Sequence, residues 1–216
     1  MNRKEKAKKI GGILDGLYKK TPIPLDHTSD YTLLVAVMLS AQTTDKKVNQ
    51  VTPDLFKRAD TPERMSQLDT SAIQSIIKEI GLAPTKAKNL KKMASQIISA
   101  GGLKPSWSFL ESLAGVGHKT ASVVMSQWYD IPAFPVDTHI HRLAARWGLS
   151  NGKSVEKTEK DLKKVWDKHL WNKRHLQIIF FGREYCPARS HDLAKCIICS
   201  WAATKKRIKI ESRKSG

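Results

Sequence analysis

Residues 109–127 read FLESLAGVGHKTASVVMSQ, and this stretch gives the strongest indication of the fold. Apolar residues up to Leu113 predict a helix that ends at Gly115, Val116 and Gly117, and a second helix is expected from about His118. Two glycines around one apolar residue allow a tight turn and bring backbone N–H groups close to a ligand. The start of the second helix adds unpaired N–H groups and the positive end of its dipole. The stretch therefore predicts a binding site for a phosphate group.

Lys119 and Thr120 resemble the end of a nucleotide-binding P-loop, but two features exclude that motif. The P-loop needs a glycine directly before its lysine, whereas His118 stands there. No strand is evident before the glycines either. We therefore reject the P-loop interpretation.

Helical periodicity extends outward from this stretch in both directions. Apolar residues recur at three- and four-residue steps in 84–100, 137–147 and 172–185. Residues 31–39 are rich in β-branched and large apolar side chains, but no partner strand is evident, so a buried helix is predicted. Proline and glycine separate these segments, and 131–135 is expected to cross between two helical lobes. The predicted fold class is all-α.

Composition narrows the range of partners. The 216 residues include 38 Lys and Arg against 20 Asp and Glu, a net charge of +18, which favours a polyanion such as nucleic acid, an anionic membrane surface or an acidic protein. The longest apolar stretch, 33–39, is far shorter than the roughly 20 residues of a membrane span, so no membrane is expected as partner. No apolar segment follows the basic N-terminus, and three cysteines argue against a disulfide-stapled secreted domain. We expect a cytoplasmic, nucleoid-associated protein.

Four segments carry a resemblance to a known family. They are LLVAVMLSAQTTD (33–45), IGLAPTKAKNL (80–90), LAGVGHKTA (113–121) and VDTHI (136–140). In this order they resemble the endonuclease III-type DNA glycosylases of the helix-hairpin-helix GPD superfamily, over about residues 8–200. The resemblance implies an all-α fold of two lobes with a DNA groove between them. One lobe would be a six-helix lobe (22–133) with the helix-hairpin-helix at 109–127, and the other would combine 1–21 with 134–216.

The resemblance also implies an activity and a site. The chain would be a monomeric DNA repair glycosylase with AP lyase activity, acting on double-stranded DNA that carries a damaged base, expected to be an oxidised pyrimidine, or an abasic site. Lys119 would form a Schiff base with the sugar, and Asp137 would be the assisting carboxylate. The structural alternative for Asp137 is a helix N-cap, and both roles can hold together. The implied DNA-binding residues are Gln42, Leu82, Gly115, Val116, Gly117, His118 and Thr120.

Two other functions are compatible with the same motifs. One is a non-catalytic helix-hairpin-helix DNA-binding protein, and the other is a glycosylase of this fold with a different lesion specificity. A pure binding module would need Gly115 and Gly117 but would not need both Lys119 and Asp137. The presence of both residues favours an enzyme.

The C-terminal cysteines depart from the family pattern. Most members end with Cys-x6-Cys-x2-Cys-x5-Cys, whose thiolates hold a 4Fe–4S cluster. Here nine residues separate Cys186 from Cys196, two separate Cys196 from Cys199, and Lys205 stands where the fourth cysteine would fall. We therefore expect no cluster and no metal.

The favoured interpretation of 186–199 is a degenerate loop held by packing of Leu193, Ile197 and Trp201. The alternative is a metal site of Cys186, His191, Cys196 and Cys199, which would suit zinc at least as well as iron–sulfur. The tail 205–216 is basic and is interpreted either as a solvated terminus or as an arm that binds phosphate. Basic residues that could still contact DNA here are Arg189, Lys195, Lys205 and Lys206.

Overall fold

The computed structural model describes residues 1–212, and every regular element among them is a helix. The all-α prediction is therefore confirmed for this part of the chain. Two compact units are present: unit 1 joins Met1–Pro22 to the chain from Pro132 onward, and unit 2 is Ile23–Ile131. Arg213 and Lys214, which belong to the predicted basic tail, lie outside the described residues.

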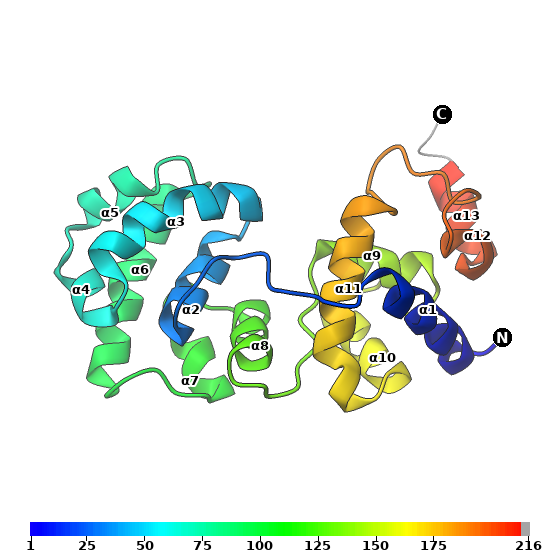
Figure 1. Ribbon diagram of the computed structural model, residues 1–216, viewed down its shortest axis with the longest axis horizontal. Helices are drawn as coiled ribbons and strands as arrows, with labels where there is room; N and C mark the ends of the chain where they lie inside the picture. Colours follow the sequence, from blue (N-terminus) through cyan, green and yellow to red (C-terminus); the bar gives the residue numbers. More distant parts are fainter. Residues whose placement is uncertain (213–216) are drawn as a thin grey trace. The chain divides into compact units, whose positions relative to one another are not determined.

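Unit 2 contains seven helices, one more than the six expected from the sequence, and all of its residues are described (Figure 1). Helix α6 packs against α4 and α5, while α2 packs against α8. The seven helices are α2 (Asp30–Leu39), α3 (Asp45–Ala59), α4 (Pro62–Gln67), α5 (Thr70–Ile76), α6 (Ala83–Ser99), α7 (Trp107–Ser112) and α8 (His118–Gln127).

Helix α2 is the centre of the unit 2 core. All nine residues from Tyr31 to Leu39 are buried, which explains why the segment is apolar on every side. Ser29 caps the helix by accepting a hydrogen bond from the backbone N–H of Thr32. The prediction of a buried helix rather than a strand is confirmed.

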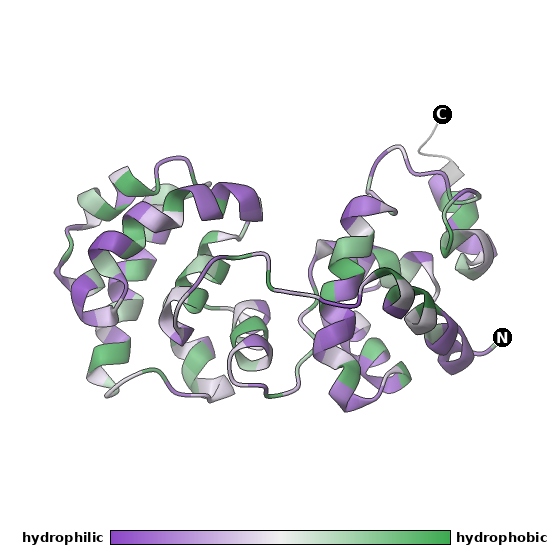
Figure 2. Ribbon diagram, viewed as in Figure 1, coloured by the Kyte–Doolittle hydropathy of each residue, from purple (hydrophilic) through white to green (hydrophobic). Residues whose placement is uncertain are grey.

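Unit 1 is built from segments at the two ends of the sequence. Helix α11 packs against both α9 and α1, over a core that includes Ile10, Trp147 and Phe181. Figure 2 shows hydrophilic residues gathered at the N-terminal end of α1, ahead of its buried apolar positions. Its elements are α1 (Arg3–Leu17), α9 (Thr138–Arg146), α10 (Val155–Val165), the 3-10 helix η1 (Lys168–Leu170), α11 (Trp171–Glu184), α12 (Cys199–Ala202) and α13 (Lys205–Ser212).

The three segments with helical periodicity form α6, α9 and α11, and each predicted end lies within one residue of the observed end. Among residues 1–212, no helix combines the length and the apolar character that crossing a bilayer requires.

Candidate functional site

The predicted hairpin is present as α7, a turn over 113–117, and α8. Gly115 has φ of +80°, and a Cβ there would lie 2.9 Å from both Asn89 Nδ2 and Met38 Sδ, so the turn requires glycine. Gly117 is the N-cap of α8, and no side chain caps this helix. The amides of the first turn are thus available to an anion. Val116 is only 6% exposed, so the turn can offer its backbone but not its side chain.

Lys119 lies in the first turn of α8 with its side chain exposed. His118, its exposed neighbour, has Nδ1 2.7 Å from Glu111 Oε1 and stacks on Trp107 with ring centroids 5.7 Å apart. Thr120 is partly buried. The contacts to Trp107 and Glu111 connect the two helices of the hairpin. Neither of these two residues was predicted, because neither belongs to the glycine motif.

Gln42 and Leu82 share an unusual backbone conformation. Both are exposed, and their φ angles are +59° and +62°, in the left-handed region that costs an L-residue roughly 1–2 kcal/mol. Their loops adjoin, because a Cβ on Gly81 would lie 3.4 Å from the carbonyl oxygen of Gln42. The structure therefore brings these two predicted residues together, and backbone strain of this kind often marks a functional site.

Lys86 holds the loop that carries Gln42. Its Nζ donates hydrogen bonds to the carbonyl oxygens of Leu39 at 2.8 Å and Ala41 at 2.6 Å. The residue is 6% exposed, and burial lowers the pKa of its amine. Lys86 was not predicted; the available signal was a lysine among the apolar positions of α6.

Asp137 is the N-cap of α9, in unit 1. Its Oδ1 accepts a hydrogen bond from the backbone N–H of Ile140 at 2.8 Å, and the side chain is half-buried. The cap uses Oδ1 and fixes the direction of the carboxylate, whose Oδ2 can serve as a base or as a negative charge. Lys119 belongs to unit 2, so the two predicted catalytic residues lie in different units.

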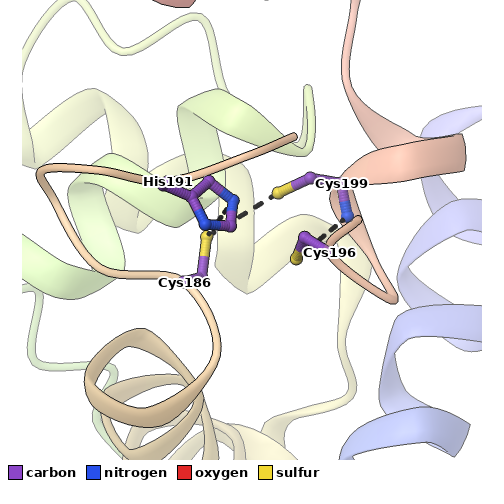
Figure 3. Close-up of side chains that lie close together, drawn as sticks. All are labelled: Cys186, His191, Cys196 and Cys199. Carbon is purple, nitrogen blue, oxygen red and sulfur yellow. Dashed lines mark hydrogen bonds between the residues drawn. The ribbon is translucent and has the colours of Figure 1, made fainter. Parts of the chain in front are cut away.

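Cys186, His191, Cys196 and Cys199 converge in unit 1, with their ligand atoms all within 4.8 Å of one another (Figure 3). Cys186 Sγ lies 3.7 Å from Cys199 Sγ and 3.4 Å from His191 Nε2. The three cysteines are buried and unpaired by disulfides. Hydrogen bonds with Cys186 and Cys199 lower the pKa of the Cys196 thiol. This group could hold a metal ion, as in the alternative that the sequence left open for these four residues.

Two arginines of α9 form hydrogen bonds to the start of the loop that contains the cysteines, residues 186–199. Arg146, 1% exposed, donates to Cys186 Sγ at 3.2 Å and to the carbonyl oxygen of Pro187 at 2.6 Å. Arg142 donates to the carbonyl oxygens of Gly182 and Cys186. These partners lie about 40 residues away in sequence, so the helical periodicity of the sequence did not predict these contacts. The helix that Asp137 caps thus also carries the two arginines that hold the loop.

Residues 35–168 match the sequence profile of the HhH-GPD superfamily of base excision DNA repair proteins. The chain belongs to this superfamily. Endonuclease III of Treponema pallidum (strain Nichols) is 40% identical over 197 residues, which cover 89% of this chain and 93% of that protein. Endonuclease III of Escherichia coli (strain K12) is 37% identical, with 95% of this chain and 99% of that protein covered. The resemblance found in the motifs is confirmed.

Solved structures of superfamily members agree with this membership. A non-covalent endonuclease III–DNA complex matches with a TM-score of 0.91 at 33% identity, over 99% of this chain and 100% of that chain. A trapped endonuclease III–DNA covalent intermediate matches with a TM-score of 0.90 at 33% identity, over 97% and 100%. The fold is therefore the helix-hairpin-helix glycosylase fold.

The residues of this HhH-GPD chain do not fit the four-thiolate 4Fe–4S cluster implied by the family pattern. Only three cysteines are present. Position 205, where the family has its fourth cysteine, is an exposed lysine at the start of α13. In a 4Fe–4S cluster each cysteine sulfur binds a different iron atom. These sulfurs must therefore lie farther apart than two cysteine sulfurs that bind the same ion. The distance of 3.7 Å between Cys186 Sγ and Cys199 Sγ is too short for that arrangement.

The packing expected for the degenerate loop is only partly present. Leu193 and Trp201 are partly buried and pack on the unit 1 core. Ile197 is 46% exposed, so its predicted role is wrong, and Ile198 is the fully buried neighbour. The loop has no regular period, so the sequence did not indicate which of the two isoleucines points inward.

Proposed function

We propose that this chain is a DNA repair glycosylase with AP lyase activity. One observation carries the proposal: an exposed lysine, Lys119, stands in the first turn of α8, directly after the glycine turn of the hairpin. A phosphate held by the turn amides would place the DNA backbone beside this amine. Membership of a base excision repair superfamily and the relationship to endonuclease III support the same function.

Lys119 would act as the nucleophile in its neutral form. Its Nζ forms a bond to C1′ of the deoxyribose, and the bond from C1′ to the base breaks with the electron pair leaving on the base. Loss of the amine proton and opening of the sugar ring give a Schiff base. Removal of a C2′ proton then expels the 3′ phosphate by β-elimination, and water releases the lysine. The strand is cut 3′ to the abasic site.

Asp137 would assist the same step through its carboxylate. Positive charge develops on the sugar as the base leaves, and a nearby carboxylate stabilises it or accepts the amine proton. The hydrogen bond from Ile140 fixes the orientation of the group without neutralising it. Asp137→Asn would keep the N-cap and remove the charge, which separates the two roles.

Gln42 and Leu82 would act where the duplex opens. Rotating a nucleotide out of the stack costs a few kcal/mol. Two adjoining exposed loops with fixed, strained backbones suit this work, Gln42 by filling the gap and Leu82 by entering the stack. Other contacts would be to phosphates, through the hairpin and the exposed basic residues Arg189, Lys195, Lys205 and Lys206.

The test is borohydride reduction in the presence of a duplex with one abasic site or one thymine glycol. Reduction converts the Schiff base to a stable amine, so the wild-type chain should become covalently attached to the DNA. Lys119→Gln should abolish the adduct, whereas Lys160→Gln, at an exposed position of α10, should leave it unchanged.

The outcomes separate the candidate functions. Tight DNA binding without any adduct would overturn the lyase proposal and favour the non-catalytic binding protein. An adduct with the abasic site but no release of thymine glycol would favour a different lesion specificity. Asp137→Asn is expected to slow excision strongly while leaving thermal stability almost unchanged, because the asparagine oxygen still caps α9.

A further inference from the structure

We propose that Cys186, His191, Cys196 and Cys199 bind a single zinc ion. Four ligand atoms of the kinds that zinc prefers converge in one place, although the residues are spread over 14 positions of an irregular loop. Cys196 and Cys199 have the Cys-x2-Cys spacing of many zinc sites. His191 supplies the fourth ligand in place of the cysteine that is missing at position 205.

Two distances among the ligand atoms match those expected around one tetrahedral ion. With zinc–sulfur bonds of about 2.3 Å and zinc–nitrogen bonds of about 2.0–2.1 Å, a tetrahedron places two sulfurs about 3.8 Å apart and a sulfur and a nitrogen about 3.6 Å apart. The observed distances are 3.7 Å from Cys186 Sγ to Cys199 Sγ and 3.4 Å from Cys186 Sγ to His191 Nε2. Figure 3 shows Cys186 and His191 lying close together and facing Cys196 and Cys199.

The surroundings also suit thiolate ligands. Arg146 donates to Cys186 Sγ at 3.2 Å, and the backbone N–H of Cys199 donates to Cys196 Sγ at 3.4 Å. Hydrogen bonds of this kind orient metal ligands and stabilise their negative charge. Three thiolates, a neutral imidazole and Zn²⁺ together carry one negative charge, and the buried Arg146, which also pairs with Glu211, is a cation beside it.

The site would be structural. All four positions of the ion are taken by protein ligands, which leaves no place for a water or substrate. The ion would close the loop 186–199 and hold Cys199, the first residue of α12, beside Cys186. It would thereby replace, with one ion and a histidine, the support that four thiolates and a cluster give in most of the family.

Metal analysis of the purified chain provides the test, with no DNA present, so its result is independent of the proposed excision activity. About one zinc ion per chain is expected, without stoichiometric iron or sulfide. Cobalt exchanged into the site should give the strong visible bands of a tetrahedral ion and thiolate charge-transfer absorption. His191→Ala should weaken zinc binding by more than the roughly 10–100-fold that loss of an outer-shell partner costs.

Two further variants keep the test decisive. His169→Ala removes an exposed histidine of the same unit and should change neither zinc content nor the cobalt spectrum. His191→Cys restores a fourth ligand and should retain zinc while strengthening the charge-transfer bands. A brown protein with about four irons would overturn the proposal. So would a metal-free chain whose melting temperature does not respond to added zinc, a disulfide between two of the cysteines, or His191→Ala that binds cobalt as the wild type does.

Discussion

Lys86 is a buried cation whose partners are carbonyl groups. Its amine hydrogen-bonds to Leu39 and Ala41, where α2 ends and the last carbonyls of the helix have no partner within it. The negative end of the α2 dipole lies at the same place, and it favours a positive charge. One side chain of α6 thus closes the end of α2 and fixes the loop before Gln42.

Replacing Lys86 tests this role. Lys86→Met keeps the length of the side chain but leaves two carbonyl groups without their charged donor, so the free energy of unfolding should fall by about 2–3 kcal/mol. Denaturant unfolding measures the change. Lys88→Met, at an exposed position of the same helix, serves as the matched control and should have little effect. Equal effects of the two substitutions would contradict the role assigned to Lys86.

At the scale of elements, α1 and α11 are joined by a polar network around Asp15. Arg174 donates to both carboxylate oxygens of Asp15 at 2.8 Å, and Lys173 lies 2.6 Å away. Gly11 allows this contact, because a Cβ there would lie 2.9 Å from Arg174 Nη2. The hydrogen bond with Arg174 is the main cause that holds the pKa of Asp15 below its ordinary value.

The network makes the stability of unit 1 depend on pH. The folded-state pKa of Asp15 is depressed, so its contribution is fully present above the unfolded pKa of about 3.9 and is lost as pH falls below that value. As the pH is lowered from 7 to 3, the melting temperature of Asp15→Asn should therefore fall less steeply below about pH 4 than that of the wild type. That variant should also be less stable at pH 7. Asp167→Asn, at an exposed position, is the control, and a wild-type slope in Asp15→Asn would contradict the assignment.

At the scale of the whole molecule, the net charge of +18 acts on DNA without regard to sequence. Each phosphate that binds a lysine or arginine releases counterions, so affinity falls steeply as salt rises. For six to ten phosphate contacts, the affinity for undamaged duplex should fall roughly 10³–10⁵-fold between 50 and 200 mM salt. Fluorescence anisotropy measures it. The double variant Lys205→Gln, Lys206→Gln should reduce the logarithmic slope by about one for each phosphate that is no longer bound, and an unchanged slope would exclude these residues from the interface.

Local patterns predicted the elements better than the contacts between them. Periodicity placed α6, α9 and α11 to within one residue, and the glycine turn identified the hairpin. The partners of Lys86 and Arg146 are set by tertiary packing over 40 or more residues, which no local pattern encodes. The convergence of His191 with the cysteines depends on the path of an irregular loop. These are the contacts that position the candidate site.

The discontinuity of unit 1 has a consequence for synthesis of the chain. Unit 2 is continuous, so it can fold once residue 131 has left the ribosome. Helix α1 emerges long before its partners α10 and α11, which begin at Val155 and Trp171. At 5–20 residues per second, α1 waits roughly 7–30 s with Ala7, Ile10 and Leu14 uncovered. Lys8 and Lys9, which lie between Ala7 and Ile10, interrupt this apolar stripe and should limit its association with other nascent chains during translation.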